Sequence, residues 1–396
     1  MTENELAHLK VMVVDDDPFQ ISIVRRVLGL LGVAKVGEAT NGSMTKDLLQ
    51  SQWDVMLLDL NMPDMDGIEL LRMLTEYESP PAIIVFSGED PRLLETASDL
   101  AKNFGLPILG SLPKPISLDR LKEMLHAFSA ESPSHSVRPE MVILTEDEIK
   151  AGIISGCIEL HYQPKVDAVT MQMIGLEALL RWRRTDGTLL GPGSVIPVAE
   201  ASDLIHVLTK EIFVIAVNQA ARWHAAGKKW KGSCNFSIED LASPDIVAFV
   251  EAVIAQSGIP PERIILEVTE SKLAQDPSLI LEQLTRIRLR GIGLSIDDFG
   301  TGFSSMEQLR KFPFTELKID RAFVFGASSQ PAARAIFESS VQLAHRLNMV
   351  AVAEGAETEE DLLLCGELKV DLIQGYVVAR PMPPEQVLAW NAERNR

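Results

Sequence analysis

The sequence predicts an α/β protein of two domains: a doubly wound (βα)5 domain followed by a modified, TIM-like (β/α)8 barrel. At 396 residues the chain exceeds what one hydrophobic core usually serves. Short β-branched runs alternate with amphipathic stretches, which is the pattern of a parallel sheet covered by helices. A Ser- and Pro-rich break without apolar periodicity interrupts this alternation at 129–138. We therefore expect domains over 1–128 and 144–396, joined by a linker over 129–143.

The first domain is predicted from five apolar runs separated by helical patterns. Helices are expected over Pro18–Leu31 and Ile68–Glu76. The expected strands are Val11–Val14, Lys35–Glu38, Val55–Leu58, Ala82–Phe86 and Pro107–Leu109.

The second domain shows the same alternation on a larger scale, and about 250 residues with eight strands fit a TIM-like barrel. The expected strands are Ile158–Tyr162, Met173–Arg181, Ser233–Ser237, Ile264–Val268, Gly293–Asp297, Leu317–Ile319, Val350–Ala353 and Leu372–Gln374. The expected helices include Leu204–Ala226, Ile246–Gln256, Ser278–Arg290 and Ala332–Leu347. The first two strands are too close for a helical crossover, so we expect them to form a hairpin.

Composition narrows the function classes. The net charge of -19 repels nucleic-acid backbones, so a nucleic-acid-binding output is not expected. The first ten residues lack the apolar core of a signal peptide, and no apolar run is long enough to span a membrane. The three cysteines, Cys157, Cys234 and Cys365, are far apart and form no CxxC pair, as is typical of a reducing compartment. We expect a cytoplasmic protein without membrane contact.

Polar residues stand at the ends of strands in the first domain. Asp15 and Asp16 end the first strand, and Asp59 ends the third; Ser87 closes the fourth, and Lys114 follows the fifth. Ligands bind at this edge of a doubly wound sheet, and three carboxylates there require a divalent cation. A single aspartate would be explained more simply as a solvated helix cap. Five such residues favour phosphoryl chemistry with Asp59 as nucleophile.

This domain resembles the receiver domain of two-component signalling. The motifs are VVDDDP at 13–18, DLNMPDMDG at 59–67 and PKP at 113–115. The resemblance implies that Asp59 is the phospho-acceptor, that Asp15, Asp16 and Asp59 hold Mg²⁺, and that Ser87 and Lys114 are the switch residues. It also implies a cis peptide bond before Pro115 and a phosphodonor partner, either a sensor histidine kinase or a phosphotransfer protein.

One position departs from the receiver pattern. Many receivers have Tyr or Phe three residues before the lysine, and Ser111 stands there in this chain. The usual aromatic route of signal transmission is therefore not expected, although phosphorylation is.

A ring of polar residues stands at strand ends in the second domain. Glu177 and Arg181 are four apart and so share one face of their strand, where barrels normally hold aliphatic side chains. The ring continues with Asn235, Glu267, Asp297, Asp298, Lys318, Asp320, Glu354 and Gln374. Asp297 and Asp298 can reach one site if their strand ends there, as the following FGTGF suggests. Any single strand-end Glu is more often structural, but so many are hard to explain as packing. Oxygen ligands without a His cluster favour Mg²⁺ or Mn²⁺ over zinc.

The second domain resembles the EAL family of cyclic di-GMP phosphodiesterases. The motifs are EALLR at 177–181, YQP at 162–164, NFS at 235–237, EVTES at 267–271, DDFGTGFSS at 297–305, KID at 318–320, AEGAE at 353–357 and QGY at 374–376. Ala356 and Phe303 are mild departures, and no GGDEF-type cyclase motif is present.

The resemblance assigns roles to these residues. The implied ligands of two Mg²⁺ or Mn²⁺ ions are Glu177, Asn235, Glu267, Asp297, Asp298 and Glu354. Lys318 would position the attacking water; Gln163, Arg181, Asp320 and Gln374 would contact substrate; and Glu270, Phe299, Gly300, Thr301 and Gly302 would belong to a regulatory dimerisation loop. The implied reaction is hydrolysis of cyclic di-GMP to linear pGpG.

Two alternatives to an enzyme remain open from the sequence. A degenerate domain of this kind senses cyclic di-GMP without cutting it, although such domains usually lose ligands and this one keeps them. A scaffold would need no catalysis. The joining of the two domains suggests that phosphorylation of Asp59 changes the output, and family tendency favours a homodimer or a larger homo-oligomer.

Overall fold

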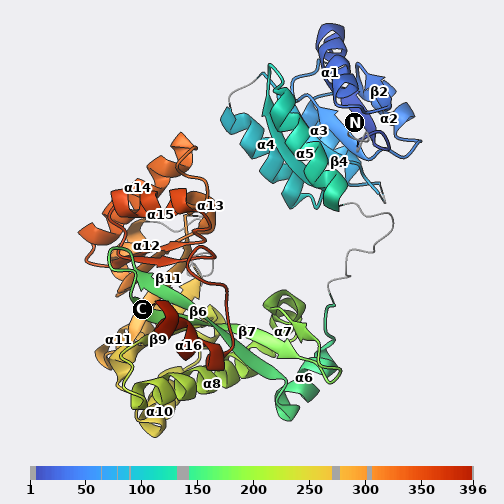
Figure 1. Ribbon diagram of the computed structural model, residues 1–396. Helices are drawn as coiled ribbons and strands as arrows, with labels where there is room; N and C mark the ends of the chain where they lie inside the picture. The colour runs from blue at the N-terminus through green and yellow to red at the C-terminus, as the bar shows by residue number, and fades with distance from the viewer. Residues whose placement is uncertain are drawn as a thin grey trace. The chain divides into compact units, whose positions relative to one another are not determined.

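The computed structural model divides the chain into two compact units, Met1–Pro139 and Glu140–Arg396 (Figure 1). The structure describes residues 6–63, 65–77, 79–88, 91–131, 142–269, 277–300 and 306–394. Each unit is described by itself.

The N-terminal unit is a five-stranded parallel sheet with strand order β2-β1-β3-β4-β5. The strands are β1 (Lys10–Val14), β2 (Lys35–Ala39), β3 (Val55–Leu58), β4 (Ala82–Ser87) and β5 (Ile108–Pro113). The helices are α1 (Pro18–Leu30), α2 (Gly42–Leu48), α3 (Gly67–Leu74), α4 (Pro91–Asn103) and α5 (Leu118–Glu131). The strand order reverses between β1 and β3, which is where ligands bind in open α/β sheets.

Both faces of this sheet are buried, which explains its nearly continuous apolar strands. Val11 and Val13 of β1 belong to one apolar core, whereas Met12 and Val14 belong to another on the opposite face. The predicted (βα)5 arrangement is confirmed. The fifth strand, however, extends to Pro113 rather than ending at Leu109, so Lys114 follows it directly.

The C-terminal unit is a closed barrel. Its sheet has nine strands in the order β6-β14-β13-β12-β11-β10-β9-β7-β8, and pairing of β6 with β7 closes it, so that β8 lies outside the ring. The strands are β6 (Ile158–Asp167), β7 (Met173–Arg183), β8 (Leu189–Leu190), β9 (Lys231–Asn235), β10 (Ile264–Thr269), β11 (Gly293–Phe299), β12 (Glu316–Ile319), β13 (Val350–Glu354) and β14 (Leu372–Gln374). Strand β6 is antiparallel to both of its neighbours, and the other seven strands of the ring run parallel. The modified barrel and its initial hairpin are thus confirmed.

Helices surround this barrel (Figure 1). They are α6 (Glu146–Ser155), α7 (Ile196–Ala201), α8 (Ile205–Ala225), α9 (Ile238–Leu241), α10 (Ile246–Ser257), α11 (Pro277–Leu289), α12 (Met306–Lys311), α13 (Arg321–Val324), α14 (Pro331–Arg346), α15 (Glu359–Glu367) and α16 (Pro384–Arg394), with short 3₁₀ turns η1 (Pro192–Ser194) and η2 (Pro261–Arg263). Helix α6 begins with a capping box, in which Thr145 and Glu148 satisfy each other's backbone N–H groups.

Several strand boundaries of the barrel differ from the prediction by two residues or more. Strand β6 continues five residues beyond Tyr162, because its later residues pair with both β7 and β14. Strand β9 ends at Asn235, two residues earlier than expected. Strand β11 does not end at Asp297 but continues to Phe299.

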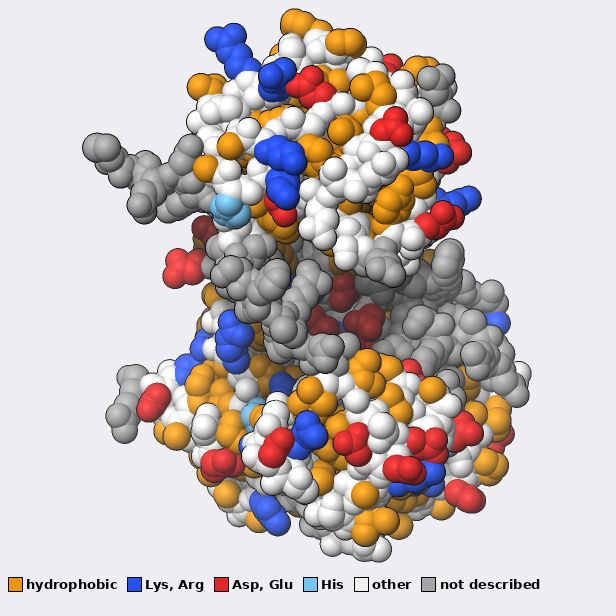
Figure 2. Space-filling view, turned by 90° about the vertical axis from the view of Figure 1, so that its right-hand side faces the viewer, with side chains coloured by type: hydrophobic (Ala, Val, Ile, Leu, Met, Phe, Trp, Pro, Cys, Tyr) orange, Lys and Arg blue, Asp and Glu red, His pale blue; other side chains and the backbone are white. Residues whose placement is uncertain are grey.

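The surface of the described residues mixes charges of both signs. On the face shown in Figure 2, Lys and Arg side chains lie singly or in small groups among acidic and apolar ones. In the part of the chain that the structure describes, no helix combines the length and apolarity needed to cross a bilayer.

Candidate active site

The barrel strands bring the predicted polar residues together at one end. Glu177 lies on β7, Glu267 on β10, Asp297 on β11 and Glu354 on β13, with Lys318 on β12 among them. The carboxyl ends of parallel barrel strands meet at one edge, which is where active sites of such barrels lie. The sequence folds this way locally because each acidic residue follows an apolar run that is buried as a strand.

Lys318 is the centre of the cluster. Its side chain is only 1% exposed, and its Nζ lies 3.3 Å from Glu177 Oε2, 2.9 Å from Glu267 Oε2, 3.0 Å from Asp297 Oδ1 and 2.5 Å from Glu354 Oε1. Burial alone would lower the pKa of Lys318, but the surrounding carboxylates raise it well above its usual value. Lys318 is therefore held as an ammonium group.

Amide side chains fix Glu177. Asn235 Nδ2 donates to Glu177 Oε1 at 2.9 Å, and Gln374 Nε2 donates to Glu177 Oε2 at 2.6 Å. Gln374 also donates to Gln163 Oε1, and Gln163 Nε2 donates to the carbonyl of Ala379. The orientation of Glu177 is thus determined by strands on both sides of it.

Asp297 and Asp298 reach the same site through a backbone irregularity. The pairing register between β11 and β12 shifts between Ile296 and Phe299, and Asp298 has φ 54°, in the left-handed region. The expected strand end is wrong; a bulge instead turns the second aspartate. One oxygen from each of Asp297, Asp298 and Glu354 lies within 4.8 Å of the others.

Burial and the proximity of charged groups shift the pKa values of the acidic residues. Burial and the neighbouring Glu267 raise the pKa of Glu177, and burial and Asp297 raise that of Glu354 well above its usual value. Burial would also raise the pKa of Glu267, but Lys165 and Lys318 hold it below its usual range. The site therefore has more negative charge than its own lysines balance.

Two charged residues that sequence reasoning missed lie deeper in the barrel. Lys165 of β6 and Glu316 of β12 are buried and form an ion pair of 2.8 Å, and Lys165 Nζ also lies 2.7 Å from Glu267 Oε1. A signal was present: Lys165 is two residues from Gln163, and Glu316 is two residues from Lys318. Period-2 alternation places each pair on one strand face.

A cavity of about 280 Å³ opens over the cluster. It is lined by Gln163, Glu177, Leu179, Asp297, Lys318, Arg321, Glu354, Gly355, Glu357, Gln374, Gly375 and Tyr376. At its rim, the Arg321 guanidinium pairs with Glu357 at 2.9 Å.

The remaining predicted residues lie around this cavity or elsewhere. Burial lowers the pKa of Arg181, which shares its strand face with Glu177. Asp320 caps α13 by accepting from the N–H of Ala322. Phe299 ends β11, and Gly300 follows with φ 101°. Glu270, Thr301 and Gly302 lie outside the described residues.

The donor set fits divalent cations. Glu177, Glu267 and Asp297 offer one oxygen each within 4.8 Å of one another, next to the group formed by Asp297, Asp298 and Glu354. Carboxylate oxygens are the ligands that Mg²⁺ and Mn²⁺ prefer. Asp297 belongs to both groups, as a ligand shared between two cations would.

The N-terminal unit has a second acidic cluster. One oxygen from each of Asp15, Asp16 and Asp59 lies within 4.8 Å of the others. Lys114 Nζ lies 2.7 Å from Asp15 Oδ2 and 2.9 Å from Asp59 Oδ2. Burial raises the pKa of Asp15, partly offset by Lys114. Ser87 is buried at the end of β4.

The backbone around Asp59 is tightly determined. The N–H of Leu60 donates to Asp59 Oδ1 at 2.8 Å. A Cβ on Gly67 would lie 2.6 Å from the carbonyl oxygen of Asp59, so only glycine fits there. The peptide bond between Lys114 and Pro115 is cis, as the resemblance implies.

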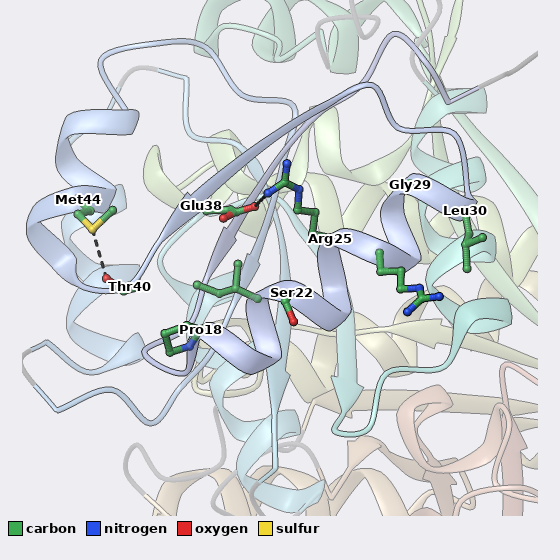
Figure 3. A pocket seen from close by; sticks show the side chains of 10 residues that line it. Pro18, Ser22, Arg25, Gly29, Leu30, Glu38, Thr40 and Met44 are labelled. Carbon is green, nitrogen blue, oxygen red and sulfur yellow. Dashed lines mark hydrogen bonds and ion pairs between the residues drawn. The ribbon is translucent and has the colours of Figure 1, made fainter.

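A larger hollow of about 670 Å³ lies elsewhere on this unit, against α1, β2 and α2 (Figure 3). Arg25 and Glu38 pair at 3.1 Å on one side of it, and Thr40 contacts the sulfur of Met44 on the other. Its lining, among the described residues, does not include the acidic cluster of Asp59.

Comparison with known proteins assigns a family to each of the two domains. Residues 11–126 match the response regulator receiver domain, and residues 146–381 match the EAL domain. The chain is 32% identical over 385 residues to the cyclic di-GMP phosphodiesterase RocR of Pseudomonas aeruginosa, covering 96% of this chain and 98% of RocR. It is 39% identical over 231 residues to the bifunctional diguanylate cyclase/cyclic di-GMP phosphodiesterase MucR of the same organism, covering 58% of this chain and 34% of MucR.

Solved structures match the barrel. The PaMucR phosphodiesterase in its c-di-GMP complex has a TM-score of 0.59 and 37% identity, over 61% of this chain and 98% of that one. The EAL enzyme Bd1971, bound to cAMP and cyclic di-GMP, has a TM-score of 0.59 and 28% identity, over 69% of this chain and 73% of that one.

These matches identify the chain as a response regulator in which a receiver domain precedes an EAL barrel. The chain belongs to the EAL domain family, and its order of domains is that of RocR over nearly the whole length of both chains.

Proposed function

We propose that the protein hydrolyses cyclic di-GMP to linear pGpG. The observation that carries this proposal is the barrel cluster itself: Glu177, Glu267, Asp297, Asp298 and Glu354 converge with Lys318 at the carboxyl edge, beneath a cavity. Similarity to RocR over nearly the full chain and to structures holding cyclic di-GMP supports the choice of substrate.

The acidic residues, with Asn235, would hold two Mg²⁺ or Mn²⁺ ions. Bound cations of this kind generate a nucleophile from water at neutral pH and neutralise charge that develops on phosphorus. Water adds to one phosphorus, one ester P–O bond breaks, and the departing ribose oxygen takes a proton.

The chain's own side chains orient these groups. Lys318, held as an ammonium group, can position the attacking water and stabilise developing negative charge. Gln374 donates to Glu177 and to Gln163, and both glutamines line the cavity. Arg181 lies on the same strand face as Glu177, where a guanidinium suits phosphate. Burial of the cluster strengthens each of these electrostatic interactions.

The direct test is hydrolysis of cyclic di-GMP by the full chain with Mg²⁺ or Mn²⁺, followed by separation of nucleotide products. Glu177→Ala is expected to lower turnover by at least about 10³-fold, because it removes a ligand and releases Asn235 and Gln374. Glu146→Ala, an exposed glutamate on α6 paired with Lys150, is the matched control and should leave turnover unchanged. Absence of pGpG in the presence of cyclic di-GMP binding would favour the sensor alternative.

We also propose that phosphorylation of Asp59 regulates this hydrolysis. The proposal is supported by the ion pair of Lys114 with Asp59, by the place of Ser87 at the end of β4, and by the presence of the barrel in the same chain. A sensor histidine kinase or a phosphotransfer protein would be the donor. A coupling of about 1–3 kcal/mol between two sites would change turnover roughly 5–150-fold.

Comparing turnover with and without a phosphoryl mimic tests the regulation. The change is expected in the parent protein and should disappear in Asp59→Asn, which cannot accept the group. Equal turnover under both conditions in the parent protein would contradict regulation through Asp59, whatever the basal activity. A homodimer or larger assembly through the EAL domain is proposed as well, and sedimentation of the full chain would test it.

A further inference from the structure

The barrel holds a second layer of charge beneath the acidic cluster. Lys165 Nζ lies 2.7 Å from Glu267 Oε1 and 2.8 Å from Glu316 Oε1, and Ser295 Oγ donates to the same Glu316 oxygen at 3.2 Å. Lys165 is 2% exposed, Glu316 3% and Ser295 0%. These groups are therefore removed from solvent and bind one another.

Strand geometry places this layer one step deeper than the site. Glu316 precedes Lys318 by two residues on β12, and Ser295 precedes Asp297 by two on β11, so each shares the inward face of its strand. Strand β6 runs in the opposite direction, and on it Lys165 follows Gln163 by two. All three deeper residues thus lie below a residue that lines the cavity.

Stability alone does not explain such a pair. Barrel interiors are normally filled by branched aliphatic side chains. A buried ion pair contributes no more than well-packed apolar residues of similar volume, because desolvation offsets the attraction. The contact to Glu267 gives the pair a second role.

The two carboxylate oxygens of Glu267 have different partners. Lys165 binds Oε1 from below, whereas Lys318 binds Oε2 at 2.9 Å from within the cluster. Glu316 in turn holds the Lys165 ammonium in place. Rotation of the Glu267 carboxylate would break the contact with Lys165 and leave that ammonium with Glu316 alone.

We propose that Lys165 and Glu316 are a positioning pair, which holds Oε1 of Glu267 so that only Oε2 is presented to a divalent cation. This inference rests on the proposed metal-dependent function of the barrel. It assigns Lys165 and Glu316 no contact with substrate; both act through Glu267.

The positioning role and a simple effect of charge predict opposite changes in the cation affinity of Lys165→Met. Removing a buried positive charge near the cluster would tighten cation binding if charge were the only effect. Loss of positioning would weaken binding by about 10–100-fold, as is typical when the partner of a metal ligand is removed. The double variant Lys165→Met, Glu316→Leu keeps the net charge of the barrel and leaves no unpaired ion.

The experiment is a titration of the full chain with Mn²⁺, in which the EPR signal measures the concentration of free Mn²⁺. Glu267→Gln defines the baseline without an intact barrel site, and the receiver contribution is common to all variants. Lys150→Met, on the exposed face of α6, is the matched control. Thermal unfolding verifies that each variant is folded; if Lys165→Met fails to fold, the double variant carries the test.

The expected result is weaker Mn²⁺ binding to the barrel in both Lys165 variants, with Lys150→Met unchanged. Glu316→Gln, which keeps an oxygen acceptor for Lys165, should retain affinity within about tenfold. Tighter binding in Lys165→Met with an unchanged double variant would overturn positioning in favour of charge balance, and unchanged binding throughout would also overturn it. If the parent binds no more Mn²⁺ than Glu267→Gln, the metal site itself fails, and this inference fails with it.

Discussion

The two acidic sites of this chain share a plan and differ in burial. In each, carboxylates on or after parallel strands surround a lysine that another strand brings to the same edge of the sheet. In the receiver domain, Lys114 is 16% exposed and Asp16 is exposed. In the EAL domain, Lys318 is 1% exposed and a deeper layer of charge lies beneath it. The barrel lysine is thus more enclosed than the receiver lysine, and the receiver cluster has one exposed carboxylate, although Asp15 and Asp59 themselves are buried.

The difference teaches what each site can accept. Under the proposed function, a phosphoryl group would reach Asp59 from another protein, at an edge where Asp16 is exposed and Lys114 is partly exposed. A small dinucleotide can enter a cavity, where a low dielectric strengthens every charge that faces it. Enclosure therefore suits the chemical step, and openness suits receipt of the signal.

The balance of charge also differs. Three carboxylates face one lysine in the receiver cluster, which leaves two negative charges in excess. In the barrel, counted as formal charges, Glu316 and the five carboxylates of the cluster face Lys165 and Lys318, which leaves four. One divalent cation would neutralise the first excess and two would neutralise the second.

The largest expected effect is that of metal addition on stability. At a concentration about 100 times its dissociation constant, each bound cation stabilises its domain by about 2.7 kcal/mol. Two cations in the barrel therefore raise its free energy of unfolding by about twice as much as one raises that of the receiver. Hydrogen exchange in denaturant, measured on peptides of each domain, gives the free energy of unfolding of both domains. Equal gains in the two domains would contradict the proposed difference in the number of bound cations.

The next effect comes from removing the two lysines one at a time. Lys318→Met leaves enclosed carboxylates facing one another and should destabilise the metal-free barrel by about 3–5 kcal/mol. Lys114→Met acts on a partly solvated site and should cost the receiver about 1–3 kcal/mol. The same peptide-resolved exchange separates the domains, and a receiver loss as large as the barrel loss would contradict the role given to burial.

The smallest effect is expected at an exposed ion pair. Arg25 and Glu38 pair on the receiver surface with side chains 67% and 38% exposed. Glu38→Gln should change receiver stability by no more than about 1 kcal/mol, because water screens the pair. Hydrogen exchange in urea, measured on peptides of the receiver domain, provides the measurement, and a loss comparable to that of Lys114→Met would mean that exposure is not the deciding variable.

Much of the fold follows from pattern alone. Strand β3 and strand β14 have the predicted ends, and the short separation of β6 from β7 correctly predicts a hairpin. The end of β6 could not be predicted, because it depends on pairing with β14, some two hundred residues away in sequence. Local periodicity carries no information on such a partner.

The site was predictable where each residue followed an apolar run, as Glu267 and Glu354 do. The turn that brings Asp298 beside Asp297 was not, because it arises from a register shift against β12 and a positive φ. Sequence reasoning missed Lys165 and Glu316 for another reason: both lie outside the expected strands Ile158–Tyr162 and Leu317–Ile319, and only the longer strands of the structure give them an inward face.

The reversed direction of β6 determines where the chain enters the barrel. Because β6 is antiparallel to its neighbours, its first residue, Ile158, pairs with Trp182 near the carboxyl end of β7. In an all-parallel barrel the first strand would begin at the opposite, closed end. Here α6 leads into β6 at the same end of the barrel as the site. A displacement of the segment that leads into β6 would therefore act directly on the strand that carries Gln163 and Lys165.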